Sequence, residues 1–351
     1  MPDEPLTERE HAILEAVIRT YVETAEPAGS RNVARRFRLG ISPATVRNTM
    51  SDLEDKGYLF HPHTSAGRVP TDLAYRLYVD SLMRRPRLSP AEWSSIRQGL
   101  DPGGEGAAVE NLLRRAAQVL GLLTHELGIA IGPRLDEAAL ERLELVPLSE
   151  AKVLLVLALR SAGVRTIYVD VPASIPPQTL AAVARVLNER LAGLTLREIR
   201  ATLPERLRDS MGAGDGPGAA ELLNVFLQSA DELFVTERGG GTELHLGNAS
   251  VLAGQPEFSS GERLKALIEL TERRDLLRSV VGNRIGGDGL KVTIGVEHGD
   301  PALSDFTLVT SEYKLGDLRG VIGVIGPTRM PYERVIALVE STSTLISEYL
   351  T

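Results

Sequence analysis

The sequence contains no cysteine among its 351 residues. Disulfide bonds and thiolate metal sites are therefore excluded, and a reducing compartment is the default expectation. The polar N-terminal stretch MPDEPLTERE is unlike a secretory signal peptide. The longest unbroken apolar run, VLLVLAL at 153–159, is far shorter than the ~18 residues of a membrane span. These absences predict a cytoplasmic protein that does not enter a membrane.

Acidic side chains are also missing from residues 27–51, a stretch that holds five arginines: Arg31, Arg35, Arg36, Arg38 and Arg47. The whole chain carries a net charge of −8, and the acidic excess lies after residue 88. A local basic patch on an acidic protein is typical of one module that meets phosphates, joined to modules that do not.

No catalytic triad, carboxylate pair or metal-ligand cluster stands out along the chain. The glycine-rich stretch ERGGGTELHLG at 237–247 lacks the Lys-Ser/Thr pair of a phosphate-binding loop and the strand and helix that frame one. We therefore predict no enzyme activity, no cofactor and no metal site. His61 and His63 could form a zinc-binding pair, but no third ligand lies nearby in the sequence.

The first 88 residues predict three helices followed by a two-stranded loop. A capping box at Thr7 and Glu10 begins the first helix, and Ser30 is the expected N-cap of the second. The third helix is predicted from Ser42 to Lys56, followed by strands at 58–60 and 68–70 around a Pro/Gly-rich turn. This is the element order of a winged helix-turn-helix, whose later helix enters the major groove of DNA.

The polar face of the third helix suits the edges of base pairs. Asn and Arg make paired hydrogen bonds to adenine and guanine, and Ala and Thr methyl groups contact the thymine methyl. The start of the second helix and its arginines would hold phosphates. The predicted DNA-binding residues are Ser30, Arg31, Arg35, Ser42, Ala44, Thr45, Arg47, Asn48, His63 and Arg68.

After residue 88 the patterns predict a mixed α/β domain that is interrupted by an insertion, so the chain as a whole is of the α+β class. Alternating apolar residues mark strands near 165–171 and 290–296, and the stretch between them is rich in helix signals and glycine. We expect a linker at 89–103, the two parts of the α/β domain at 104–199 and 288–351, and the insertion at 200–287.

Three segments together carry a family resemblance. ISPATVRNTMSDLEDKGYLFHPHTSAGRVPTDLAYRLYVD (41–80), LNERLAGLTL (187–196) and VIGVIGPTRMPYERVIALVE (321–340) resemble the HrcA family of bacterial heat-inducible transcription repressors. The resemblance implies a GAF-like domain interrupted by a dimerisation domain. It also implies a homodimer that binds double-stranded DNA at an inverted-repeat operator of the CIRCE type, before chaperone operons.

The same resemblance implies a partner and a mode of control. A GroEL-type chaperonin would support repression, and heat would divert that chaperonin to unfolded proteins and so relieve repression. Two alternatives stay open. One is a regulator gated by a small molecule in the GAF-like domain, and the other is an enzyme that carries a DNA-binding domain, as in the biotin-ligase repressors.

Overall fold

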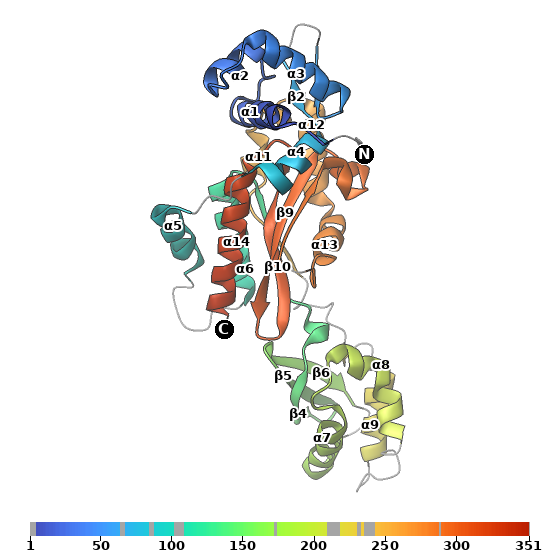
Figure 1. The fold of residues 1–351 in the computed structure, drawn as a ribbon. Helices are drawn as coiled ribbons and strands as arrows, with labels where there is room; N and C mark the ends of the chain where they lie inside the picture. The colour runs from blue at the N-terminus through green and yellow to red at the C-terminus, as the bar shows by residue number, and fades with distance from the viewer. Residues whose placement is uncertain are drawn as a thin grey trace. The chain divides into compact units, whose positions relative to one another are not determined.

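The computed structural model describes residues 5–63, 67–83, 88–101, 109–171, 174–208, 218–229, 233–234, 243–287 and 289–350. They form a mixed helical and sheet structure, which agrees with the predicted class (Figure 1). The chain divides into two compact units. Unit 1 covers 1–130, 244–312 and 322–346, and unit 2 covers 131–243, 313–321 and 347–351.

Unit 1 begins with three helices, α1 (Glu8–Thr24), α2 (Ser30–Arg36) and α3 (Pro43–Asp55). The predicted capping box of Thr7 and Glu10 is present at the start of α1. The N-cap of α2 is Gly29 rather than the expected Ser30, which is the first helical residue. The reason is tertiary: the preceding residue, Ala28, is held by backbone hydrogen bonds to Arg68, so the chain turns into the helix one residue earlier.

An ion pair joins the start of α1 to the end of α3. Glu10 is only 6% exposed, and the Nζ of Lys56 donates to its Oε1 at 2.7 Å. Burial alone would raise the pKa of Glu10, but hydrogen bonds from Lys56 and Thr7 to the carboxylate outweigh it and lower the pKa to about 2. Glu10 therefore stays ionised and keeps the two helix ends together at neutral pH.

Two short strands follow α3. β1 (Leu59–Phe60) pairs antiparallel with β2 (Val69–Pro70). The chain leading into β2 runs so close to Ala28 that a Cβ on Gly67 would lie 2.4 Å from the Ala28 carbonyl carbon. Only glycine fits at this position without moving the backbone. The two-stranded loop is thus fixed against the segment between α1 and α2.

The helix after the strands connects to the rest of unit 1. α4 (Asp72–Leu77) continues into a π-helical turn, η1 (Tyr78–Leu82). Arg76 donates from Nε to Glu297 Oε1 at 2.7 Å and from Nη2 to the Val292 carbonyl at 2.8 Å, and the Val296 amide donates to Asp72 Oδ2 at 3.0 Å. These bonds hold α4 to the edge of the larger sheet.

A helix stands where we expected a linker. α5 (Pro90–Leu100) fills most of 89–103, starts with a capping box of Ser89 and Glu92, and buries Ile96 and Leu100. It packs on α6 (Val109–Thr124). The residues expected to form a linker thus contain a helix, and its capping box follows directly on the proline-rich RRPRLSP segment.

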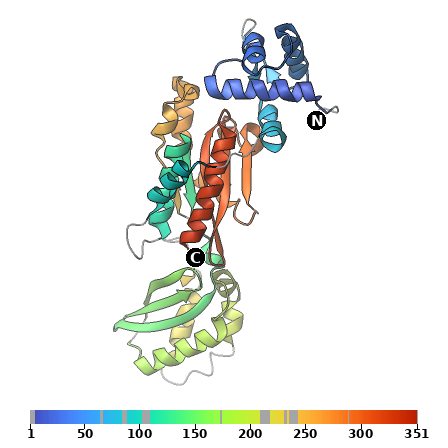
Figure 2. The same ribbon diagram turned by 60° about the vertical axis from the view of Figure 1, so that its left-hand side comes forward.

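The larger sheet has five strands in the order β7-β3-β10-β9-β8. Its members are β3 (Leu127–Ile131), β7 (Leu244–Leu246), β8 (Leu290–Ile294), β9 (Phe306–Leu315) and β10 (Leu318–Pro327). The C-terminal helix α14 (Tyr332–Tyr349) lies along the sheet (Figures 1 and 2) and buries a continuous apolar stripe. The remaining elements of unit 1 are α11 (Ser250–Ala253), η4 (Pro256–Phe258), α12 (Gly261–Glu272), α13 (Arg274–Gly282), η5 (Gly295–His298) and η6 (Pro301–Leu303).

Unit 2 has a separate three-stranded sheet, in the order β4-β5-β6. Its strands are β4 (Leu140–Ser149), β5 (Lys152–Leu159) and β6 (Gly163–Asp170), preceded by a 3-10 turn, η2 (Leu135–Glu137). Its core combines the buried face of the sheet with α7 (Pro177–Leu191), α8 (Leu196–Leu207) and α9 (Ala219–Gln228). Alternate residues of β5 are buried in that core, as the period of a strand requires.

The contacts divide the chain differently from the expected boundaries. Strands within 140–170 were expected in the interrupted α/β domain, but they form the sheet of unit 2. Helices α12 and α13 were expected in an insertion at 200–287, but they belong to unit 1. The correction has a simple cause. Alternation in the sequence identifies a strand, but the strands it pairs with depend on contacts that lie far apart in the chain.

Candidate nucleic-acid interface

One face of α3 is polar and exposed. Ala44, Arg47, Asn48 and Ser51 are all exposed, and the last three follow Ala44 by three, four and seven residues. That spacing places them on one side of the helix. The opposite side buries the apolar residues Val46, Met50 and Leu53. Arg47 and Asn48 are thus accessible to a partner that meets this face.

The start of α3 is fixed by Ser42. Its Oγ accepts a hydrogen bond from the Thr45 amide at 3.1 Å and lies 3.0 Å from the Thr45 hydroxyl. Pro43 takes the first helical position, where no amide hydrogen is needed. Ser42 and Thr45 therefore hold one another at the N-terminus of the helix, and Thr45 is half-buried.

The arginines of α2 and α3 differ in whether they form an ion pair. Arg36 forms an ion pair with Glu23 of α1. Arg31, Arg35 and Arg47 are exposed, and none of them forms an ion pair with any residue that the structure describes. Three available cations on two neighbouring helices give this end of unit 1 a locally positive surface.

The loop between β1 and β2 contributes less than the sequence suggested. His63 is exposed, whereas Arg68 is only 9% exposed. The Arg68 Nη2 lies 2.7 Å from Glu54 Oε2, and the His61 Nδ1 lies 2.8 Å from Glu54 Oε1. Arg68, which the sequence predicted to contact DNA, therefore ties the loop to the end of α3. The sequence showed an arginine in a loop but not the carboxylate that it meets.

Helices α2 and α3 lie on the side of α1 away from the five-stranded sheet (Figures 1 and 2). Within the described ranges, no group of three or more His, Asp or Glu side chains could hold a metal ion. Nor does any helix in these ranges have the length and apolar character to cross a membrane. The exposed arginine-bearing surface of α2 and α3 is thus the strongest candidate site near the N-terminus.

Comparison with known proteins identifies the family. The model of the HrcA protein C-terminal domain matches residues 110–336. The heat-inducible transcription repressor HrcA of Chlorobium phaeobacteroides (strain BS1) is 39% identical to this chain over 98% of both. The protein of the same name from Desulforamulus reducens is 35% identical over 98% of this chain and 97% of its own. The chain belongs to the HrcA family.

The HrcA family is a family of transcription repressors by name, which is not a class of enzyme. The similarity to the Chlorobium phaeobacteroides protein covers almost the entire chain. It therefore includes the N-terminal helices, which lie outside the residues that the family model matches. A crystal structure of a hypothetical protein also covers 99% of both chains with a TM-score of 0.61. At 24% sequence identity, this likeness supports the fold alone.

Proposed function

We propose that this HrcA-family chain is a heat-inducible repressor that reads DNA with its N-terminal elements. In this proposal α2 and α3 form the helix-turn-helix, and β1, β2 and the loop between them form the wing. The single observation that carries the proposal is the exposed face of α3, with Arg47 and Asn48 side by side and no acidic partner among the described residues. A face meant only for water would normally carry paired charges instead.

Each predicted contact then has a role. Arg47 and Asn48 hydrogen-bond to base edges in the major groove, with the methyl groups of Ala44 and Thr45 against thymine. Ser30, Arg31 and Arg35 lie at the start and on the face of α2, where free amides and cations suit phosphate oxygens. Ser42 positions α3 through its cap, and His63 reaches the backbone from the wing.

We also propose that the protein acts as a homodimer and that unit 2 supplies the dimer interface. One face of the β4-β5-β6 sheet is buried in the unit's core. The other is exposed and carries apolar side chains together with the Arg142–Glu144 and Lys152–Asp170 ion pairs. Val164 and Tyr168 of β6 are 67% and 70% exposed, and they lie opposite Ala158 and Leu154 of β5. A cluster of exposed apolar side chains of this kind marks a protein interface rather than a solvated surface.

Two-fold symmetry of the dimer would match the inverted repeat that the family resemblance implies. Two copies of α3 would enter successive major grooves ~34 Å apart, or a multiple of that distance. The CIRCE-type operator, the chaperone operons and the GroEL-type chaperonin come from the family resemblance. We propose the five-stranded sheet and its helices as the GAF-like domain and residues 131–243 as the insertion. The protein would work in the cytoplasm, at the nucleoid when bound to DNA.

The test is Arg47→Ala in a gel-shift titration. If Arg47 reads a guanine, the variant loses ~1–3 kcal/mol of operator binding, and discrimination at one base pair per half-site falls with it. Arg278→Ala, an exposed arginine on α13, is the matched control and should bind as the wild type does. If Arg47→Ala keeps the affinity and the base preference of the wild type, Arg47 does not read a base.

A further inference from the structure

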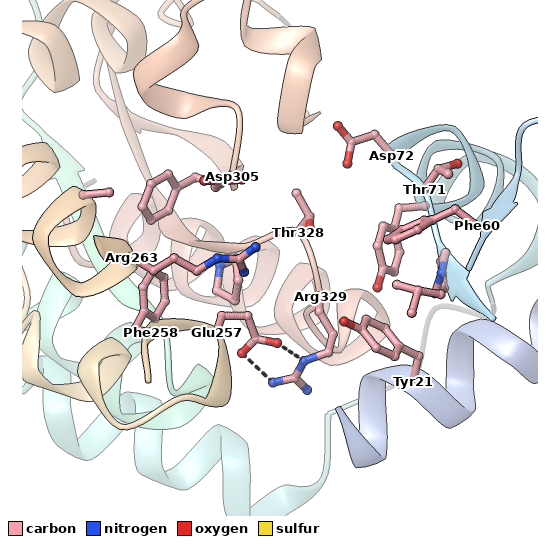
Figure 3. A pocket seen from close by; sticks show the side chains of 16 residues that line it. Tyr21, Phe60, Thr71, Asp72, Glu257, Phe258, Arg263, Asp305, Thr328 and Arg329 are labelled. Atoms are coloured by element: carbon pink, nitrogen blue, oxygen red, sulfur yellow. Dashed lines mark hydrogen bonds and ion pairs between the residues drawn. The ribbon is translucent and has the colours of Figure 1, made fainter. Parts of the chain in front are cut away.

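A cavity of about 350 Å³ lies within unit 1, between the two short strands and the elements around the larger sheet (Figure 3). This volume is in the range of small-molecule sites, roughly 300–1,000 Å³. One wall comes from α1, β1, β2 and α4, and the other from η4, α12 and the ends of β9 and β10. A molecule in this cavity would touch both groups of elements.

The deeper walls are aromatic. Phe258 and Phe306 are almost fully buried, and their rings stack with centroids 5.9 Å apart at an angle of 20°. Tyr75 is fully buried, and Phe60 at 44% exposure lines the opposite wall. Walls of this kind accept a flat apolar or aromatic body.

One polar atom of the lining has no protein partner. The hydroxyl of Tyr75 is buried, and no group in the described ranges hydrogen-bonds to it. Buried hydroxyls are nearly always paired. This oxygen has almost no accessible surface, so it lies behind the cavity surface, and a ligand could hydrogen-bond to it only if the ring moved.

The charged groups of the lining differ in how they are satisfied. Arg329 pairs with Glu257, its Nη2 lying 2.9 Å from Glu257 Oε2, as the dashed lines in Figure 3 mark. Asp72 accepts one hydrogen bond, from the Val296 amide. Arg263 and Asp305 are exposed and form no ion pair with any described residue. In Figure 3 the Arg263 side chain extends from α12 toward Thr328.

We propose that this cavity binds a zwitterionic small molecule with an apolar or aromatic body, as in a free aromatic amino acid. Arg263 would bind its carboxylate and Asp305, with Asp72, its ammonium group. Phe258 and Tyr75 would enclose its body. A ligand of one charge could pair either with Arg263 or with the two aspartates, whereas a zwitterion could pair with both. This site does not depend on the proposed DNA binding.

The binding test uses three related probes in equilibrium dialysis with the full-length protein: tryptophan, indole-3-propionate, which lacks the amine, and tryptamine, which lacks the carboxylate. Tryptophan should bind at one molecule per chain with a dissociation constant on the order of 0.1–1 mM, as expected for a ligand of this size. Each half-charged analogue should bind at least three-fold more weakly. Absence of saturable tryptophan binding, or equal binding of all three probes, would overturn the proposal.

Variants locate the site. Arg263→Gln should weaken tryptophan and indole-3-propionate at least three-fold and leave tryptamine unchanged, and Asp305→Asn should weaken tryptophan and tryptamine instead. Ala266→Trp fills the cavity and should abolish binding of all three. Arg278→Gln, on α13 and outside the lining, is the control and should bind like the wild type. Thermal unfolding checks that each variant is folded. If none of the lining variants changes tryptophan binding, the binding site lies elsewhere and the proposal is wrong.

Discussion

Arg31 and Arg68 are arginines of the same N-terminal region with opposite surroundings. Arg31 is exposed at the start of α2 and has no ion-pair partner among the described residues. Arg68 is mostly buried and pairs with Glu54 of α3. If Arg31 binds a phosphate as proposed, whereas Arg68 holds a loop in place, the two arginines should respond differently to the same substitution.

We predict that Arg31→Ala lowers the salt dependence of DNA binding by ~1 in the slope of log K against log salt concentration, without a change in unfolding free energy. Arg68→Ala should instead lower the unfolding free energy by ~1–2 kcal/mol, because it leaves a partly buried carboxylate without its charged hydrogen bond. Urea unfolding and binding at several salt concentrations separate the two. The assignments fail if the effects are reversed.

Glu126 is a buried acid without a buried cation beside it. It is 2% exposed at the start of β3, and the Gln255 amide nitrogen donates to its Oε2 at 3.2 Å. Burial raises the pKa of Glu126 well above its ordinary value, despite that hydrogen bond. The folded protein therefore holds a proton there that the unfolded chain has released once the pH exceeds the ordinary value of 4.5.

The sign of the pH dependence follows. The pKa of Glu126 is higher in the folded protein than in the unfolded chain. The contribution of Glu126 to stability is therefore fully present below pH 4.5 and is lost as the pH rises toward the folded-state pKa. Glu126→Gln, which keeps the shape and removes the titration, should stabilise the protein at pH 7, and the gain in stability should be larger at pH 8 than at pH 5. Thermal unfolding at pH 5 and pH 8 measures it. Glu269→Gln, on exposed α12, should change neither value.

At the scale of the element, α3 must be rigid as well as exposed. Its N-terminus depends on the Ser42 cap, and its C-terminus depends on the bonds that Glu54 and Lys56 make to the wing and to α1. Both ends are thus held by contacts outside the exposed face. A helix that is fixed at both ends presents Arg47 and Asn48 in one arrangement, as the proposed contact with DNA requires.

We predict that Ser42→Ala lowers the unfolding free energy by ~1 kcal/mol, because the Thr45 amide loses its acceptor. Ser42→Gly should cost only a few tenths of a kcal/mol, since glycine is tolerated at an N-cap. Chemical denaturation of the two variants gives the comparison. Equal losses in both would mean that the hydroxyl contributes through something other than the cap.

At the scale of the whole molecule, the proposed function requires two chains. A single reading helix contacts few base pairs, and a two-fold dimer doubles that contact and fixes its spacing. The exposed sheet face of unit 2 combines apolar side chains on all three strands, including Val146 and Leu148 of β4. This face supplies the surface that we assign to the dimer.

We predict that Tyr168→Lys shifts the protein toward monomer in sedimentation experiments and weakens operator binding at least ten-fold, because it places a charge in an apolar interface. The control is Glu189→Lys, on the exposed side of α7, which should remain dimeric. A Tyr168→Lys protein that sediments as the wild type does would show that the dimer forms through another surface.

The sequence by itself determined the elements that depend on neighbouring residues. The capping box of α1, the Pro43 start and the buried stripe of α3, and the strands around the wing loop all arise from signals within a few residues of one another. The acid-free stretch at 27–51 also pointed to the exposed arginines. Local hydrogen bonds and periodic burial depend on residues close together in the sequence, so the sequence predicts them directly.

Only the tertiary structure decided which distant groups meet. In the folded chain Arg68 pairs with Glu54, and strands β4 to β6 form a sheet separate from the larger one. Tyr75 and Arg263 line the same cavity. Each of these depends on contacts between segments many residues apart. Since the energy of such a contact depends on distance and burial, which the linear order does not specify, the roles of these side chains became readable only in the folded chain.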